Sequence, residues 1–199
     1  MSIPYLLILF RLLLAPVILG LGFYWGSESR FLILILMYLG LISDIFDGII
    51  ARKQGLSTEK MRRLDSQTDL IFWIAVAISC YLIYPEAISD KIYGVVLLIV
   101  MEAVCYMTSI IKFGKETCTH AFVSKMWGLT LLAAFTSLLA FGYGGWSLNV
   151  TIVVGLISHI DVLLIILLLP KWTHDVPSFY HAYLIRNGRS FKKSKYLNS

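Results

Sequence analysis

The chain alternates between long apolar runs and short polar connections. Six runs each hold about 20 residues, the length that an α-helix needs to cross the hydrocarbon core of a bilayer. Gly, Pro, Ser and charged residues separate the runs and mark turns. The pattern predicts an all-α integral membrane protein with six transmembrane helices, at residues 4–25, 31–50, 64–84, 92–111, 121–141 and 148–169.

The connections between the runs are too short to hold a separate soluble module. We therefore expect one transmembrane catalytic domain over residues 1–170, followed by a basic cytoplasmic tail over 171–199. Arg11 lies inside the first apolar run rather than before it, so we expect this run to be retained and not cleaved as a signal peptide.

Composition agrees with a membrane protein. Hydrophobic residues make up 58% of the 199 residues and charged residues 15%. A soluble domain is about 45–50% apolar and about 25% charged, so this composition excludes soluble globular and disordered chains. The net charge is +5. In a membrane protein such an excess indicates orientation and contact with anionic headgroups, so we expect membrane lipids and not nucleic acid as partners.

Basic residues gather on alternate connections. Segment 51–63 carries five Lys and Arg residues against one Glu, and the tail at 171–199 carries six against one Asp. The connections at 25–30, 85–91 and 142–147 have no positive excess. Because basic connections stay on the cytoplasmic side, we predict a multi-pass protein with both termini in the cytoplasm, in the inner membrane if the cell is bacterial.

Four aspartates lie near the cytoplasmic ends of the second and third runs. Asp44 and Asp47 are spaced i,i+3, and Asp65 and Asp69 are spaced i,i+4. Either spacing places both carboxylates on one helix face, and the short connection lets the two faces meet. Ionised groups inside a membrane are costly, so such a cluster indicates a function.

Carboxylates this close repel one another and must hold protons or cations. Oxygen ligands suit Mg²⁺, Mn²⁺ or Ca²⁺, and two divalent ions would balance four negative charges. A pair of such ions is the usual apparatus for displacement at phosphorus. Two alternatives stay open: structural pairing with Arg52, Arg62 and Arg63, and the ion site of a cation transporter. A transporter site is expected near the membrane midplane, whereas these acids lie at one edge.

The same residues form a known pattern. The segment Asp44-Ile-Phe-Asp47-Gly48-Ile-Ile-Ala51-Arg52, followed by Asp65 and Asp69, resembles the signature D-x-x-D-G-x-x-A-R-x₈-G-x₃-D-x₃-D of the CDP-alcohol phosphotransferases, also called class I CDP-alcohol phosphatidyltransferases. Met61 departs from this signature, because it stands where the family has its second glycine. A glycine there lets the chain pass close to the nucleotide, so we expect Met61 to narrow that site or to shift the loop.

The resemblance implies a fold and a reaction. Members have six transmembrane helices, usually form homodimers, and transfer a substituted phosphate from a CDP-linked donor to an alcohol with release of CMP. The active site would lie at the cytoplasmic end of the second and third helices. The site would hold two divalent ions, Mg²⁺ or Mn²⁺. One ion would be bound by Asp44, Asp47 and Asp65. The other would be bound by Asp44, Asp65 and Asp69. Asp69 would be the catalytic base, and the CDP moiety would contact Gly48, Ala51, Arg52 and Thr58.

The N-terminus extends the resemblance to one branch of the family. Its opening is similar to that of phosphatidylglycerophosphate synthases, in the residues Ile3-Pro4, Leu6-Leu7 and Phe10-Arg11. This similarity favours glycerol 3-phosphate as the acceptor. Lys125 resembles a lysine of that branch, and together with Lys112 it is our candidate for acceptor binding.

We therefore expect an integral-membrane enzyme of phospholipid synthesis that transfers a phosphatidyl group from CDP-diacylglycerol to a small polar alcohol. Glycerol 3-phosphate is the favoured acceptor. Inositol or its phosphate, serine and phosphatidylglycerol are alternatives, as is the transfer from CDP-choline or CDP-ethanolamine to diacylglycerol. A member that binds a nucleotide lipid without turnover is a further alternative, motivated by Met61.

The apolar runs also contain the ionisable residues Arg11, Glu102, His159 and Asp161. Arg11 is expected to reach the headgroups or to line the phosphate site of the donor. Glu102 is expected to face the protein interior and to pair with a residue such as Arg11 or Lys125. For His159 and Asp161 the sequence favours interhelical hydrogen bonds.

Overall fold

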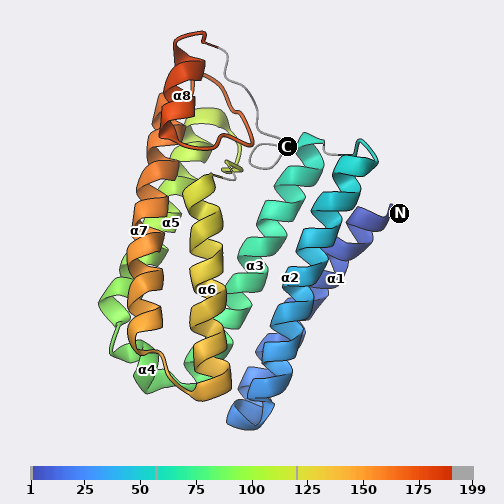
Figure 1. The fold of residues 1–199 in the computed structure, drawn as a ribbon, viewed down its shortest axis with the longest axis vertical. Helices are drawn as coiled ribbons and strands as arrows, with labels where there is room; N and C mark the ends of the chain where they lie inside the picture. Colours follow the sequence, from blue (N-terminus) through green and yellow to red (C-terminus); the bar gives the residue numbers. More distant parts are fainter. Residues whose placement is uncertain (1, 57, 120, 190–199) are drawn as a thin grey trace. The chain divides into compact units, whose positions relative to one another are not determined.

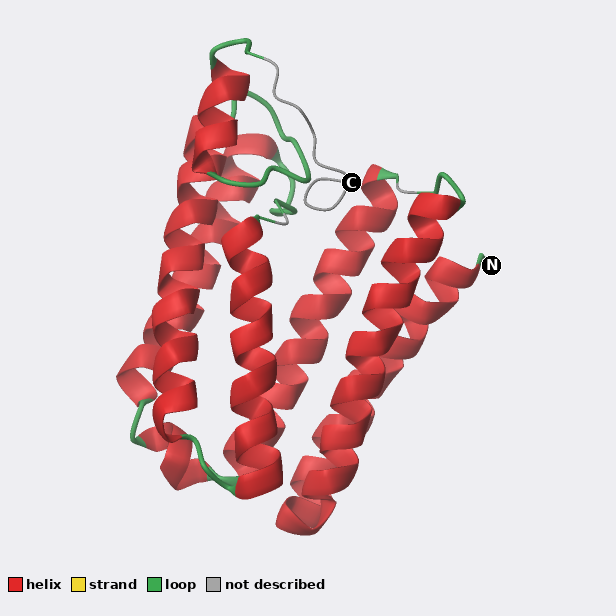
Figure 2. Ribbon diagram, in the orientation of Figure 1, coloured by secondary structure: helices red, strands yellow, loops and turns green. Residues whose placement is uncertain are grey.

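The computed structural model describes residues 2–56, 58–119 and 121–189, and every regular element in these ranges is helical (Figures 1 and 2). The helices divide into two compact units. The first comprises the chain up to Asp90 together with Ala134–Gly145, and the second comprises Lys91–Ala133 and the chain from Trp146 on. The all-α fold expected from the sequence is confirmed for the part of the chain that is described.

The first unit follows chain order through α1 (Ile3–Trp25), the four-residue 3₁₀ turn η1 (Gly26–Ser29), α2 (Arg30–Lys53), α3 (Glu59–Ile83) and α4 (Pro85–Ser89). Within it, α1 packs along both α2 and α3. This arrangement brings side chains of α1 next to the acidic ends of the other two helices.

Small residues allow the close packing in this unit. A Cβ atom on Gly40 of α2 would lie 2.3 Å from the ring of Phe72 in α3, so glycine makes room for that ring. Gly22 of α1 meets Ser79 of α3 in the same way, at 2.9 Å. Ser79 Oγ also donates a hydrogen bond to the carbonyl oxygen of Ile18, at 3.1 Å. The three helices are therefore held at short distances that larger side chains would prevent.

The second unit contains α5 (Ile92–Phe113), the first part of α6 (Phe122–Phe141), α7 (Gly145–Leu168) and α8 (Phe179–Arg186). Its apolar core combines Val162 and Ile165 of α7 with Cys105 of α5 and Ala182 of α8. Backbone hydrogen bonds join the segments that precede α6 and α8, because Val176 N donates to Thr119 O at 2.8 Å. Residues 171–189 thus include a packed helix, while Lys192, Lys193 and Lys195 of the tail lie outside the described residues.

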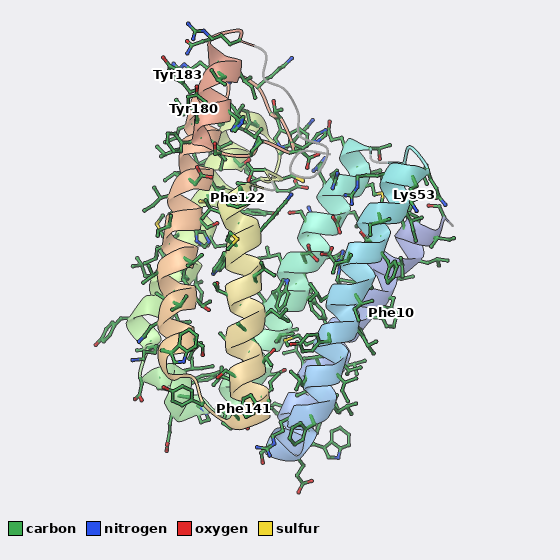
Figure 3. All side chains as sticks on the ribbon, in the orientation of Figure 1. Phe10, Lys53, Phe122, Phe141, Tyr180 and Tyr183 are labelled. Carbon is green, nitrogen blue, oxygen red and sulfur yellow. The ribbon has the colours of Figure 1, made fainter. Side chains whose placement is uncertain are left out.

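Many large apolar side chains point outward from the helices. Leu13, Ile35 and Ile99 are each more than half exposed. Exposed aromatic side chains such as Phe10 and Phe141 project from the helical ribbon (Figure 3). Such apolar outer faces suit lipid as the surrounding medium.

Five stretches of the described chain are long and apolar enough to cross a membrane. Four of them are α3, α5, α6 and α7. The fifth, Ile3–Lys53, covers 51 residues and contains α1, η1 and α2 in succession. The six predicted runs thus fall on six long helices, but the first two are joined by a helical turn, η1, where the sequence led us to expect a loop. These stretches indicate an integral membrane protein.

Candidate functional site

The local sequence between α2 and α3 folds into a tight connection. Gly55 has a φ of +65°, in the left-handed region that glycine adopts without strain. Thr58 then caps α3, because its side chain accepts a hydrogen bond from Met61 N at 3.3 Å. The last turns of α2 and the first turns of α3 therefore lie near each other in sequence and in space.

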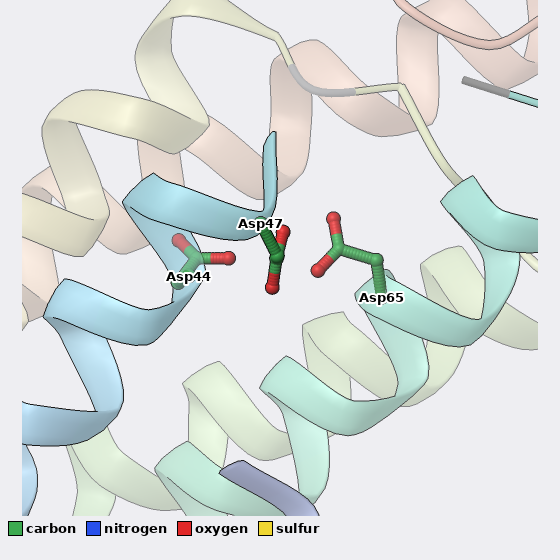
Figure 4. Close-up of side chains that lie close together, drawn as sticks. All are labelled: Asp44, Asp47 and Asp65. Atoms are coloured by element: carbon green, nitrogen blue, oxygen red, sulfur yellow. The ribbon is translucent and has the colours of Figure 1, made fainter. Parts of the chain in front are cut away.

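The aspartates predicted from the sequence converge from these two helices. Asp44 and Asp47 extend from α2 and Asp65 from α3, and the three side chains point toward one another (Figure 4). One carboxylate oxygen of each lies within 4.8 Å of the others. Asp69 follows Asp65 one turn further along α3. Oxygen donors grouped at this distance fit a divalent cation of the Mg²⁺ or Mn²⁺ type.

The guanidinium of Arg11, from α1, lies among these four carboxylates. Its Nη1 atom forms ion pairs with Asp44 of α2 and with Asp69 of α3, the latter at 3.1 Å. Its Nη2 atom forms ion pairs with Asp47 of α2, at 3.2 Å, and with Asp65 of α3. Each terminal nitrogen therefore bridges the two acidic helices, and the Arg11 side chain is only 1% exposed.

The cluster has a buried end and an accessible end. The side chains of Asp47 and Asp65 are 1% and 12% exposed, whereas those of Asp44 and Asp69 are 34% and 32% exposed. A ligand that enters the cluster thus meets Asp44 and Asp69 first.

The residues expected to contact a CDP moiety differ in their surroundings. Arg52 is exposed, and its guanidinium passes over Gly48, because a Cβ atom there would lie 3.4 Å from Arg52 Nη1. Thr58 is exposed as well, with its hydroxyl engaged at the start of α3. Ala51 is 2% exposed and packs against Ile8, so its side chain contributes to helix packing.

Met61, which replaces the glycine of the family signature, is also buried. It is 3% exposed and packs with Ile8 of α1 and Ala51 of α2, and Tyr5 and Leu56 cover this small cluster. The methionine side chain therefore fills the space between the three helices beside the aspartates.

The two lysines considered for acceptor binding belong to the second unit. Lys112 Nζ donates hydrogen bonds to the carbonyl oxygens of Ile166 and Leu167, both at 2.8 Å, near the C-terminus of α7. Lys125 is exposed on α6. The assignment of either lysine to an acceptor stays a prediction.

The second unit holds a polar cluster of its own. Glu102 pairs with His159 Nε2 at 2.9 Å, a partner that the sequence did not suggest. His159 Nδ1 bonds to the carbonyl oxygen of Gly155 at 2.6 Å, and its ring lies edge-on to Trp127, with centroids 4.8 Å apart. These contacts tie α5, α6 and α7 together, as interhelical hydrogen bonds do.

The prediction of an interhelical hydrogen bond is confirmed for Asp161, but the sequence indicated neither its partner nor the position of Arg11. Four carboxylates need positive charge, and Arg11 is the basic residue inside the apolar part of the first run, so charge balance could have indicated this pairing. Asp161 Oδ1 accepts a hydrogen bond from Phe179 N, the first residue of α8, at 2.9 Å. No local pattern signals that contact, because its partners are 18 residues apart.

Comparison with known proteins agrees with this geometry. A family model described as CDP-alcohol phosphatidyltransferase matches residues 1–157, which include all four aspartates and Arg11. No curated protein and no solved structure matches the chain.

Proposed function

The chain belongs to the CDP-alcohol phosphatidyltransferase family, and from this premise we propose that it transfers a phosphatidyl group from CDP-diacylglycerol to a small polar alcohol. The observation that carries the proposal is the convergence of four aspartates from α2 and α3 around one point. Carboxylates gathered in this way suit the divalent ions that assist displacement at phosphorus.

Two divalent ions, Mg²⁺ or Mn²⁺, are part of this proposal. Asp44, Asp47 and Asp65 would hold one ion, which fits the grouping of their oxygen atoms within 4.8 Å. Asp44, Asp65 and Asp69 would hold the other. When bound, the ions offset negative charge on the pyrophosphate and on the departing CMP. The protein contributes four hard oxygen donors, fixed on two packed helices.

Asp69 is the proposed base. It lies at the accessible end of the cluster, with its side chain 32% exposed, so an entering hydroxyl can reach it. The hydroxyl proton passes to the Asp69 carboxylate. The hydroxyl oxygen then forms a bond to the phosphorus that carries diacylglycerol, while the bond from that phosphorus to the CMP phosphate oxygen breaks.

The proposed contacts to the CDP moiety come from four residues of α2 and the start of α3: Gly48, Ala51, Arg52 and Thr58. The exposed guanidinium of Arg52 offers a bidentate donor for phosphate oxygens. It lies against Gly48, where the lack of a side chain leaves the helix surface open. Since Ala51 is buried, its contribution is to keep α2 close to α1.

Glycerol 3-phosphate is the proposed acceptor, with Lys125 and Lys112 as candidate partners for its phosphate. The exposure of Lys125 supports this role better than the position of Lys112, whose ammonium bonds to helix-end carbonyls. Inositol or inositol phosphate, serine and phosphatidylglycerol remain the alternative acceptors.

The proposed membrane arrangement has six spans. As one continuous helix, the stretch Ile3–Lys53 would extend about 76 Å, more than twice the roughly 30 Å of a hydrocarbon core. We therefore place α1 and α2 in the membrane as separate spans that reverse at η1. The basic segments then put both termini, the site and the 171–199 tail in the cytoplasm. A homodimer, usual in the family, is part of the proposal.

A screen for CMP release tests the proposal. The purified full chain in lipid nanodiscs is supplied with CDP-diacylglycerol and Mn²⁺, and each candidate acceptor is added separately. We expect CMP with one acceptor, glycerol 3-phosphate, and none without an acceptor. Absence of CMP with every acceptor, and also with CDP-choline and CDP-ethanolamine plus diacylglycerol, would contradict a transferase.

A further inference from the structure

Arg11 connects the acidic faces of α2 and α3 through both of its terminal nitrogens. Nη1 pairs with one aspartate of each helix, Asp44 and Asp69, and Nη2 pairs with the other two, Asp47 and Asp65. One buried guanidinium therefore links both helices to α1.

This linkage offsets a strong repulsion. Four carboxylates gathered around one guanidinium repel one another and destabilise the packing of α2 against α3 unless a cation lies between them. A planar guanidinium suits that position, because its donors can serve several carboxylate oxygens at once. A single positive charge still leaves the cluster negative, so it continues to attract cations.

Two details indicate that the guanidinium does not saturate the cluster. Asp47 Oδ2 is buried and accepts no hydrogen bond in the part of the chain that is described, although Arg11 Nη2 lies 3.2 Å away. Arg11 Nε is likewise buried without a hydrogen-bond partner there. The arginine is thus held through its two terminal nitrogens, by the same carboxylates that would bind metal.

We propose that Arg11 is a positioning residue that holds the acidic faces of α2 and α3 together and competes with divalent ions for the same carboxylate oxygens. An ion held by Asp44, Asp47 and Asp65 would draw on carboxylates that now pair with the guanidinium, so the guanidinium would shift when ions bind. This inference rests on the proposed two-ion site. It adds that the chain carries an internal cation whose displacement accompanies metal binding.

Binding of Mn²⁺ alone tests this competition without any turnover. The full chain in nanodiscs is first stripped with a chelator, and free Mn²⁺ is then measured by electron paramagnetic resonance during a titration. Arg11→Gln removes the charge, Arg11→Lys keeps it with fewer donors, and Arg30→Gln is the matched control, since Arg30 contacts Tyr84 instead of the aspartates. If the guanidinium-bound arrangement outweighs the open one about ten to one, Arg11→Gln should bind Mn²⁺ about tenfold more tightly.

The thermal unfolding midpoint supplies a second readout. In chelator, Arg11→Gln should unfold at a lower temperature than the wild type, because repulsion in the cluster is no longer offset. Saturating Mn²⁺ should raise its midpoint by more than it raises that of the wild type. A purely structural arginine would lower stability without tightening Mn²⁺ binding, so the two readouts together separate these roles. Arg30→Gln should change neither the affinity nor the response to Mn²⁺.

The titration distinguishes failure of the competition by Arg11 from failure of the two-ion site itself. If the wild type binds Mn²⁺ and Arg11→Gln binds it equally or more weakly, competition by Arg11 is refuted while the metal site stands. If neither protein binds Mn²⁺, the two-ion site itself is refuted. If Arg11→Gln does not fold in chelator, the Mn²⁺ affinity of Arg11→Lys tests the proposal instead. Tighter Mn²⁺ binding than in the wild type supports competition by Arg11, and unchanged affinity overturns it.

Discussion

Met61 is buried between α1 and α2, although the family signature has a glycine at this position. Its side chain packs on Ile8 and Ala51, one turn of α3 before Asp65. The methionine side chain therefore packs between the helices that carry the aspartates, and the apolar cluster there accommodates its volume. At the scale of single residues, this departure from the signature is compatible with an intact acid cluster.

Replacing Met61 with glycine should leave a cavity in that cluster. Loss of a buried side chain of this size costs about 2–5 kcal/mol, and glycine near the start of a helix adds up to about 1 kcal/mol. We expect a clearly lower thermal unfolding midpoint for Met61→Gly in detergent. Met126→Gly is the control: Met126 is exposed on α6, so only the helix cost of about 1 kcal/mol applies. Equal losses for both variants would show that Met61 does not pack as described.

At the scale of elements, the approach of α2 to α3 depends on Gly40. A Cβ atom there would lie 2.3 Å from the Phe72 ring, so Gly40→Ala forces the ring or a helix to move. Overpacking of this kind costs about 1–3 kcal/mol. We expect Gly40→Ala to lower the unfolding midpoint, and the added change Phe72→Leu to restore part of it.

A matched glycine on α1 serves as the control for this prediction. No atom lies within 4 Å of a Cβ built on Gly20, and alanine favours a helix over glycine by up to about 1 kcal/mol. Gly20→Ala should therefore leave stability unchanged or raise it. A Gly40→Ala protein as stable as Gly20→Ala would contradict the close packing of α2 on α3.

The sequence predicts the long helices well, because each depends on a local property. Apolar length sets where they lie, and Gly26, Pro85 and Gly114 mark their ends close to the observed positions. The short helix α8 could not be predicted in this way. It has only eight residues, and it depends on the cap from Asp161 and the packing of Ala182, both of which are contacts with α7 or α5.

For the acid cluster too, the sequence predicts what depends on local spacing but not what depends on contacts between distant segments. The i,i+3 and i,i+4 spacings place the aspartates on two helix faces, and the short connection brings these faces together. The position of Arg11 needs one further fact, that α1 packs along both α2 and α3. No pattern within α1 encodes that packing, so the sequence alone left Arg11 at the headgroups or at a donor phosphate.

At the scale of the whole molecule, the path of the chain through the membrane depends on the turn between α1 and α2. The residues of η1 allow a reversal, and Ser27 within it is exposed. Gln54, just beyond α2, is exposed as well. If α1 and α2 cross the membrane separately, these two positions lie on opposite sides.

Cysteine labelling in intact membranes checks this arrangement. A membrane-impermeant thiol reagent should label Ser27→Cys from the outside only, and Gln54→Cys only after the cytoplasmic side is opened. The native Cys80, Cys105 and Cys118 are at most 4% exposed and should react little. Labelling of both introduced cysteines from the same side would contradict a separate crossing by α1 and α2.

The most direct test of the central claim, that the aspartates of α2 and α3 hold divalent ions for phosphatidyl transfer, is the rate of CMP release from CDP-diacylglycerol with an acceptor. The wild type should release CMP with Mn²⁺ or Mg²⁺ and stop in chelator. Asp69→Asn should be slower by about 100-fold or more, as expected for loss of a base. Asp90→Asn, at an exposed aspartate beyond α4, should keep the wild-type rate. Release that persists without divalent ions, or an Asp69→Asn protein as fast as the wild type, would contradict this account.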